Sequence, residues 1–336
     1  MCSIKSNNLQ SLASLVPEYY TNGRAKGTIK QYSIYYKQFR EFAVCNEFHP
    51  IGVEPFIVAC YLIQLDIAGT SEAVISQSLA AINLVHEVWG LSSPSKDPVV
   101  IQVKHAIIKS LNRVKVKKNR QPFTIDIVAK FIAKFYKPNE FVKPVERRLL
   151  MIILILFFGV KRFDDIIRTQ LKHLVWEKDG SVTIQVPFSK TDPLGQGNEF
   201  TLSHDDSEVF SVVTILKWYV KSFKFSAESF IFPPFAFCKS NQDGLQPVGS
   251  KPISYSSIRA QLKEESKKIG LDYDLDLHGG RIGGATTASG LQVDRDIIKQ
   301  SGFWKSSAVD SYIRKLNPNK HLSKVLSSEM SRKLKK

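Results

Sequence analysis

Cysteine is scarce in this chain of 336 residues, which holds only four. They are Cys2, Cys45, Cys60 and Cys238, and no two of them form a CxxC pair. Paired thiolates at short spacing are the usual mark of a zinc site, and a disulfide framework needs cysteines at regular spacings. The sequence therefore predicts no metal site and no disulfide framework, and it indicates a reducing compartment.

Long hydrophobic runs are absent as well. The longest, "LLMIILILFFGV" over residues 149–160, has twelve residues and is followed directly by the charged segment "KRFDD". A membrane-spanning helix needs about 20 apolar residues, so this run indicates a buried helix instead. The first residues, "MCSIKSNN", lack the apolar core of a signal peptide. We therefore expect an intracellular soluble protein that does not bind a membrane.

Acidic residues are too few to balance the basic ones. The chain has 47 Lys and Arg against 31 Asp and Glu, which leaves a net charge of +16 and a pI near 9.6. A surplus of this size favours a polyanionic partner, because each phosphate that a cation contacts releases condensed counterions. Nucleic acid is the partner that we favour, although a ribosomal protein or a protein of an anionic membrane surface would carry similar charge.

Nucleotide-binding motifs are also missing, despite a glycine-rich stretch. The segment "HGGRIGG" (278–284) has no Lys at the position that a GxxxxGK[ST] loop requires. It also precedes a helical stretch, whereas the GxGxxG dinucleotide loop follows a strand and has an acidic residue about twenty positions later. We therefore expect no nucleotide cofactor, and no other cofactor is indicated.

Helical periodicity dominates the chain, and one short region alternates as a strand does. Four helices are expected before residue 115, and a predominantly helical region follows from residue 123. The alternating segment 181–192 and the segment 198–203 predict an antiparallel hairpin across the turn "DPLGQG". The predicted fold class is mainly α with a small antiparallel sheet (α+β). The predicted parts are an α-helical domain (1–112), a basic linker (113–122) and a second domain (123–336).

The linker "RVKVKKNRQP" carries five basic residues, no acidic residue and a closing proline. Such a run is typical of a segment that follows a DNA backbone, and equally of a solvated charge run or a nuclear-import signal. We favour contact with DNA, which is compatible with import. The candidate DNA-binding residues are Arg113, Lys115, Lys117, Lys118 and Arg120.

Several residue types that act on phosphates occur in a characteristic order in the second domain. Gly159, Arg162 and Asp165 follow the buried helix in a G-x-x-R-x-x-D pattern. The other members, in chain order, are Lys190 in "SKT", His278 and Arg281 in H-x-x-R, Trp304 and Tyr312. In this order they resemble the boxes of the tyrosine recombinases, the phage-integrase family. The "GFWKS…Y" wording further resembles the recombinases of eukaryotic mobile elements of the crypton and DIRS-like kind.

The resemblance covers both predicted domains and implies an activity. It implies a helical core-binding domain and a catalytic domain that cleaves and rejoins DNA at specific sites through a 3′-phosphotyrosine intermediate. Tyr312 matches the nucleophile, and Arg162 with Arg281 matches the pair that holds the phosphate oxygens. Two guanidiniums suit this role because each can make two parallel hydrogen bonds to oxygens.

The remaining matched residues serve proton transfer and support. Lys190 matches the general acid for the leaving 5′-hydroxyl, and His278 orients the phosphate or accepts the phenolic proton. Trp304 offers an indole N–H donor and a packing surface, and Asp165 orients a partner within the site. No metal takes part in this scheme.

The family further implies double-stranded DNA as the partner and a homotetramer acting on two DNA sites. We expect a nuclear protein if it belongs to a eukaryotic mobile element, and otherwise one of the cytoplasm or nucleoid. Two departures from the family are present: Trp304 and Tyr312 are eight residues apart instead of the usual nine, and "HGGR" carries two glycines. They keep two alternatives open, a DNA-binding relative without catalytic activity and a type IB topoisomerase.

Overall fold

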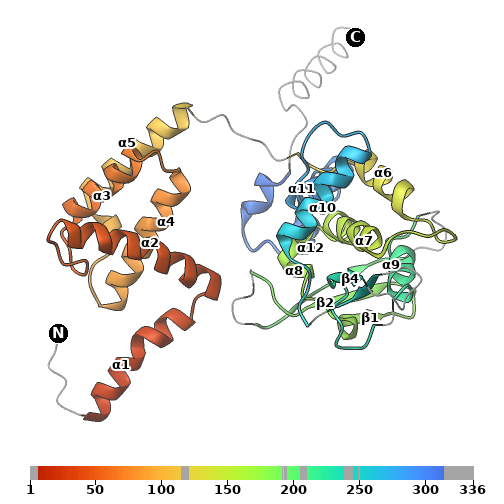
Figure 1. Ribbon diagram of the computed structural model, residues 1–336, viewed down its shortest axis with the longest axis horizontal. Helices are drawn as coiled ribbons and strands as arrows, with labels where there is room; N and C mark the ends of the chain where they lie inside the picture. The colour runs from red at the N-terminus through yellow and green to blue at the C-terminus, as the bar shows by residue number, and fades with distance from the viewer. Residues whose placement is uncertain are drawn as a thin grey trace, which may run out of the picture. The chain divides into compact units, whose positions relative to one another are not determined.

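The computed structural model describes residues 7–114, 121–190, 192, 195–204, 210–223, 225–237, 245–248 and 250–313. The chain divides into two compact units, Met1–Lys118 and Asn119–Lys336 (Figure 1). The division falls within the segment 113–122 that the sequence indicates as a linker, although the last helix of the first unit extends to Val114.

The first unit is entirely helical in its described part. Its elements are α1 (Asn7–Asn22), α2 (Lys26–Cys45), α3 (Pro55–Ile67), α4 (Glu72–Val88), a 3-10 turn (Pro94–Lys96) and α5 (Pro98–Val114). The four predicted helices correspond to α2–α5, so the prediction of four was one short. Helix α1 contains Pro17 and leaves Leu9, Leu12 and Val16 about half exposed, so it has no buried apolar face to mark it in the sequence.

The core of the first unit is built around Phe39 of α2. Its ring lies 5.2 Å from that of Tyr61 on α3, edge to face, and both side chains are buried. Leu62 and Ile82 are fully buried in the same cluster. The aromatic stripe on α2 therefore anchors this unit through one residue, while neighbouring rings of the stripe are only partly covered.

Helix α7 (Pro144–Phe158) runs through the middle of the second unit, with helices packed around it (Figure 1). Residues 148–157 of this helix are all buried, as expected for a helix that is apolar on every side. The helices that pack against α7 are α6 (Ile125–Phe135), α8 (Phe163–Ile166), α9 (Val212–Lys221), α10 (Tyr255–Lys268) and α11 (His278–Gly290). The prediction of a buried helix at this run is confirmed.

A three-stranded antiparallel sheet completes the core of the second unit. Its strands are β1 (Leu174–Trp176), β2 (Val182–Val186) and β3 (Asn198–Leu202), in the order β1-β2-β3. Ile184 stands opposite both Leu174 and Phe200, and all three side chains are buried. The predicted hairpin is confirmed as β2 and β3, and so is the fold class. The sequence did not predict β1, nor the pair β4 (Phe235–Phe237) and β5 (Leu245–Pro247).

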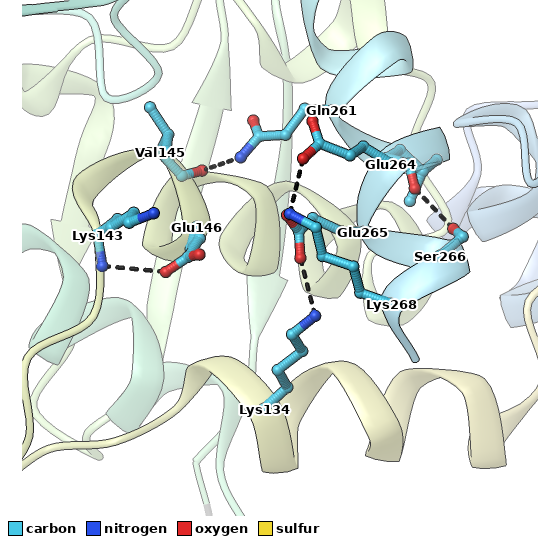
Figure 2. A network of polar contacts seen from close by, with 10 residues as sticks. Lys134, Lys143, Val145, Glu146, Gln261, Glu264, Glu265, Ser266 and Lys268 are labelled. Atoms are coloured by element: carbon cyan, nitrogen blue, oxygen red, sulfur yellow. Dashed lines mark hydrogen bonds and ion pairs between the residues drawn. The ribbon is translucent and has the colours of Figure 1, made fainter. Parts of the chain in front are cut away.

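Ion pairs and hydrogen bonds join the helices that flank α7 (Figure 2). The carboxylate of Glu265 on α10 lies 2.9 Å from the amine of Lys134 on α6 and 2.7 Å from that of Lys268. Burial acts to raise the pKa of Glu265, but the hydrogen bonds from the two lysines outweigh it and the pKa is lowered. Gln261 of α10 donates to the carbonyl of Val145 at 2.8 Å, which ties α10 to the start of α7.

The glycines of "HGGRIGG" lie at close contacts between backbones inside the protein. A side chain at Gly283 would collide with the carbonyl of Phe123, and one at Gly284 with the carbonyl of Phe157 on α7. The carbonyl of Gly279 also accepts a hydrogen bond of 3.0 Å from the Phe123 N–H. These glycines let α11 pack close to α7, which fixes the first turn of α11 against the core.

None of the helices in the described ranges is long and apolar enough to cross a membrane.

Candidate active site

Arg281, in the first turn of α11, is the buried centre of the candidate site. Its side chain has no exposed surface. One terminal nitrogen donates to the carbonyl of Val160 at 2.9 Å, and the other donates to the carbonyl of Gly302 at 2.7 Å. Burial and, to a smaller extent, the charge of Arg162 lower the pKa of this guanidinium to about 9, against the opposing effects of Tyr312 and Asp165. The side chain therefore bridges two chain segments that are distant in sequence.

Each of the two segments that Arg281 bridges contains a residue whose backbone has the left-handed conformation, with a positive φ. Val160 has φ of 52° and Phe303 has φ of 56°. This conformation is rare for bulky or β-branched residues and costs on the order of 1–3 kcal/mol, so it persists only where the surroundings fix it. The hydrogen bonds from Arg281 to Val160 and Gly302 are among the interactions that hold these turns.

The rings of Trp304 and Tyr312 lie over Arg281, and the ring of His278 lies against that of Tyr312. The ring of Tyr312 lies 5.2 Å from that of His278 and 4.9 Å from that of Trp304. The Cζ of Arg281 is 3.7 Å from the centre of the Trp304 ring and 5.2 Å from that of Tyr312. Thr286 of α11 donates to the carbonyl of Tyr312 at 3.2 Å, which fixes the backbone there. The structure thus brings four of the predicted site residues into one cluster.

The short spacing between Trp304 and Tyr312 does not fall within a rigid helix. Helix α12 (Arg295–Ser301) ends before Trp304, and Tyr312 follows the 3-10 turn Ser307–Ser311. A missing residue in an α-helix would rotate the tyrosine by about 100° around the axis. In this loop and short turn the backbone adjusts, and Tyr312 still contacts His278 and Trp304.

Asp165 connects Arg162 to the segment that carries Lys190. The Asp165 carboxylate is buried, accepts from the Arg162 backbone N–H at 3.1 Å and lies 3.8 Å from its guanidinium. Its other oxygen accepts from the Ser189 hydroxyl at 3.0 Å. Ser189 precedes Lys190, whose own side chain is exposed. Asp165 therefore orients partners on both sides, while the structure leaves Lys190 outside the aromatic cluster.

Three buried N–H donors of the predicted site residues have no hydrogen-bond partner among the residues that the structure describes. They are Nη1 of Arg162, Nε of Arg281 and Nε1 of Trp304. Buried polar groups are hydrogen-bonded in the large majority of cases, and each exception calls for an explanation. Three buried donors without a hydrogen bond, two of them on guanidiniums, are an arrangement suited to binding an anion, although Nη1 of Arg162 also lies 3.8 Å from the Asp165 carboxylate.

Lys161 belongs to the same region, and the sequence did not single it out. Its side chain is fully buried, and its amine donates to the carbonyl of Ser301. The amine also lies 3.2 Å from the centre of the Phe303 ring and 4.3 Å from that of Phe200 on β3. Burial lowers its pKa to about 6. The one sequence signal for its burial is its position directly after an apolar run. Because Arg162 follows, the pair resembles an ordinary charged segment at the protein surface.

Of the five predicted linker residues, the structure describes one. Arg113 is exposed near the end of α5, and Lys115, Lys117, Lys118 and Arg120 lie outside the described residues. Over the part of the chain that the structure covers, no three His, Cys, Asp or Glu side chains gather as a metal site would require.

Solved structures show what this fold is. A lambda integrase fragment, a dimer bound to a COC′ core site, matches with a TM-score of 0.55 and 15% identity, over 93% of this chain and 95% of the other. The Tn1549 transposon integrase in complex with circular intermediate DNA matches with a TM-score of 0.53 and 11% identity, over 82% of this chain and 86% of the other. The chain has the tyrosine-recombinase fold. A lambda integrase tetramer bound to a Holliday junction matches this recombinase fold with a TM-score of 0.52 and 15% identity, over 94% of this chain and 82% of the other. No family model and no curated protein matches the sequence.

Proposed function

We propose that the protein is a tyrosine-type site-specific DNA recombinase with Tyr312 as its nucleophile. The observation that carries the proposal is the cluster in which the Tyr312 ring lies against His278, Trp304 and Arg281. A phenol enclosed by a base, an indole donor and a guanidinium has the partners that attack on a phosphodiester requires.

The proposed step exchanges one phosphoester for another. The Tyr312 oxygen attacks the phosphorus, the bond from phosphorus to the 5′-oxygen breaks, and a 3′-phosphotyrosine ester forms. His278 accepts the phenolic proton, and Lys190 gives a proton to the departing 5′-oxygen. The reverse attack by a 5′-hydroxyl of another strand rejoins DNA and releases Tyr312. The bond energy is kept in the ester, so neither a metal nor a nucleotide enters the scheme.

The phosphate is held by the unpaired donors of the site. Nη1 of Arg162 and Nε of Arg281 bind the non-bridging oxygens, and Nε1 of Trp304 adds a third donor. Tyr312 and Trp304 cover Arg281 in the present structure, so the phosphate reaches its guanidinium only when the Tyr312 ring moves. Engagement of the phosphate and movement of the nucleophile are thus one event in this proposal.

The proposed partner is double-stranded DNA, bound by a homotetramer on two sites. The net charge of +16 supports a polyanionic partner. The lambda integrase neighbours are bound to a core site and to a Holliday junction, the second of them as a tetramer. The "GFWKS…Y" wording supports a recombinase of a eukaryotic mobile element, which would act in the nucleus.

The proposal is tested by trapping the covalent intermediate. The full chain is incubated with a pool of randomised duplexes that carry a nick, so that cleavage releases a short 5′-hydroxyl strand and cannot reverse. DNA that remains linked to denatured protein is recovered, sequenced and used as a defined substrate. We expect an adduct with wild-type protein and none with Tyr312→Phe, while Tyr273→Phe, at an exposed tyrosine outside the cluster, serves as the matched control.

Other outcomes identify the alternatives. Specific DNA binding without any adduct contradicts the enzyme and leaves a DNA-binding relative. Relaxation of supercoiled plasmid by a monomer, with no recombinant product, indicates a type IB topoisomerase. An adduct that persists in Tyr312→Phe places the nucleophile elsewhere.

A further inference from the structure

The proposed mechanism leaves one buried ionisable side chain of this region unused. Lys161 precedes Arg162, is fully buried and donates from its amine to the carbonyl of Ser301, 140 residues later in the chain. Burial of an amine is unfavourable unless its donors are satisfied, so a lysine at this position needs a reason. The rings of Phe303 and Phe200 lie 3.2 Å and 4.3 Å from the amine, so they cover it and can stabilise its protonated form.

Lys161 and Arg281 both connect the segment around Val160 to the turn that begins at Ser301. Arg281 reaches from α11 to the carbonyls of Val160 and Gly302. Lys161 follows Val160 directly and reaches the carbonyl of Ser301, which directly precedes Gly302. Two basic side chains therefore donate to adjacent carbonyls of one turn, at the end of α12. This turn contains Phe303 in its left-handed conformation and leads into Trp304.

This turn leads into the ring that contacts the nucleophile. Trp304 stands three residues after Ser301 and packs against both Arg281 and Tyr312. A shift of the turn therefore moves the ring against which the Tyr312 phenol rests. We propose that Lys161 is a positioning residue, whose amine fixes the 301–304 turn so that Tyr312 is aimed at the phosphate, and which takes up a proton when that phosphate binds. The inference rests on the proposed function.

The proton uptake follows from the charges that face the amine. Arg162 and Asp165 face it from the start of α8, and Arg281 faces it from α11, while β3 contributes only the ring of Phe200. In the free protein, burial and the two guanidiniums hold the pKa of Lys161 near 6, and Asp165 opposes them only in part. A phosphate on the two guanidiniums adds negative charge beside the amine and raises that pKa, so DNA binding near pH 7 is linked to proton uptake.

Two substitutions at this position test the inference. Lys161→Met keeps an unbranched side chain of similar length but removes the donor and the group that takes up the proton. Lys161→Gln keeps an N–H donor for Ser301 but cannot take up a proton, and it replaces Lys161→Met if that variant does not fold. Lys172→Met, at an exposed lysine paired with Glu228, is the matched control for the loss of one lysine.

The readouts separate positioning from folding. Thermal unfolding establishes that each variant is folded, and DNA affinity is measured on the selected duplex. Single-turnover adduct formation at saturating DNA gives the rate, and calorimetry of DNA binding in buffers of different ionisation enthalpy gives the protons taken up. For Lys161→Met we expect loss of the proton uptake, a weaker affinity near pH 7 because the linked protonation no longer favours binding, and a rate at saturating DNA reduced about 100-fold because the nucleophile is misplaced. For Lys161→Gln we expect partial recovery of the rate without proton uptake.

The opposite results would overturn the inference. A folded Lys161→Met that forms the adduct at the wild-type rate shows that the amine does not position the nucleophile. Unchanged proton uptake in both variants shows that another group takes up the proton. If wild-type protein forms no adduct with any duplex of the pool, the proposed function fails instead. A duplex selected by binding alone then replaces the substrate, and unchanged proton uptake in both variants on that duplex still overturns the assignment of the proton to Lys161.

Discussion

Replacing one glycine of α11 by alanine separates close packing from helix propensity. Gly283 and Gly290 lie in the same helix, but only Gly283 faces another backbone, that of Phe123. Nothing lies within 4 Å of a side chain placed at Gly290, which is exposed. Gly283→Ala therefore adds a methyl group at a closed contact, whereas Gly290→Ala adds the same methyl group in open space.

The two substitutions are expected to change the free energy of unfolding in opposite directions. Alanine in place of glycine favours a helix by about 1 kcal/mol in the interior. Overpacking costs about 1–3 kcal/mol, and the upper end applies here because the contacted atoms are backbone. We expect Gly283→Ala to lower the free energy of unfolding of the second unit by about 2 kcal/mol. We expect Gly290→Ala, at the last residue of the helix, to raise it by about 0.5 kcal/mol.

Urea denaturation followed by tryptophan fluorescence measures both changes. Trp89 is the tryptophan of the first unit, so a Trp89→Phe background makes the signal report on the second unit through Trp176, Trp218 and Trp304. If Gly283→Ala proves as stable as Gly290→Ala, α11 does not pack against the 121–123 segment as described, and the geometry of the site built on α11 is wrong.

Two further substitutions test the buried charges of the second unit. The pKa of Glu265 is lowered in the folded protein, so its contribution to stability is present above its ordinary pKa of 4.5 and is lost as the pH falls through the lowered value. The urea midpoint of Glu265→Gln should thus lie below that of the wild type at pH 7 and approach the wild-type midpoint in acid. A difference between the two midpoints that does not change with pH would contradict this. Arg281→Lys leaves one of the two carbonyls that the guanidinium bridges without a donor, so it should cost about 1–3 kcal/mol in the same measurement. If Arg281→Lys has the same free energy of unfolding as the wild type, the hydrogen bonds from Arg281 to the carbonyls of Val160 and Gly302 are absent.

Much of the fold could be predicted because its signals are local. The apolar run at 149–160 is too continuous for a surface helix, and the alternation at 181–192 has the period of a strand. Short strands such as β1 have too few residues for a period to appear, so they emerge only from pairing with their neighbours. Helix α1 was missed for another reason, since its apolar residues are exposed and no buried face constrains their spacing.

The candidate site was predictable in its residue types but not in its geometry. The order of Arg162, His278, Arg281 and Tyr312 resembles that of the tyrosine recombinases, so the sequence alone suffices to propose these residues. That Arg281 is buried and holds two backbone carbonyls could not be predicted, because both acceptors belong to turns that form only in the folded protein. The burial of Lys161 was hidden for the same reason, since its acceptor lies 140 residues away.

Mass spectrometry of the trapped adduct tests the central claim most directly. Trypsin cleaves after Lys305 and after Arg314, so Tyr312 lies in the peptide of residues 306–314, which contains no other tyrosine. After nuclease digestion of the linked DNA, we expect this peptide to carry a nucleotide remnant through the oxygen of Tyr312. A remnant on any other peptide, or none on a protein that binds its duplex, would contradict the assignment of Tyr312 as the nucleophile.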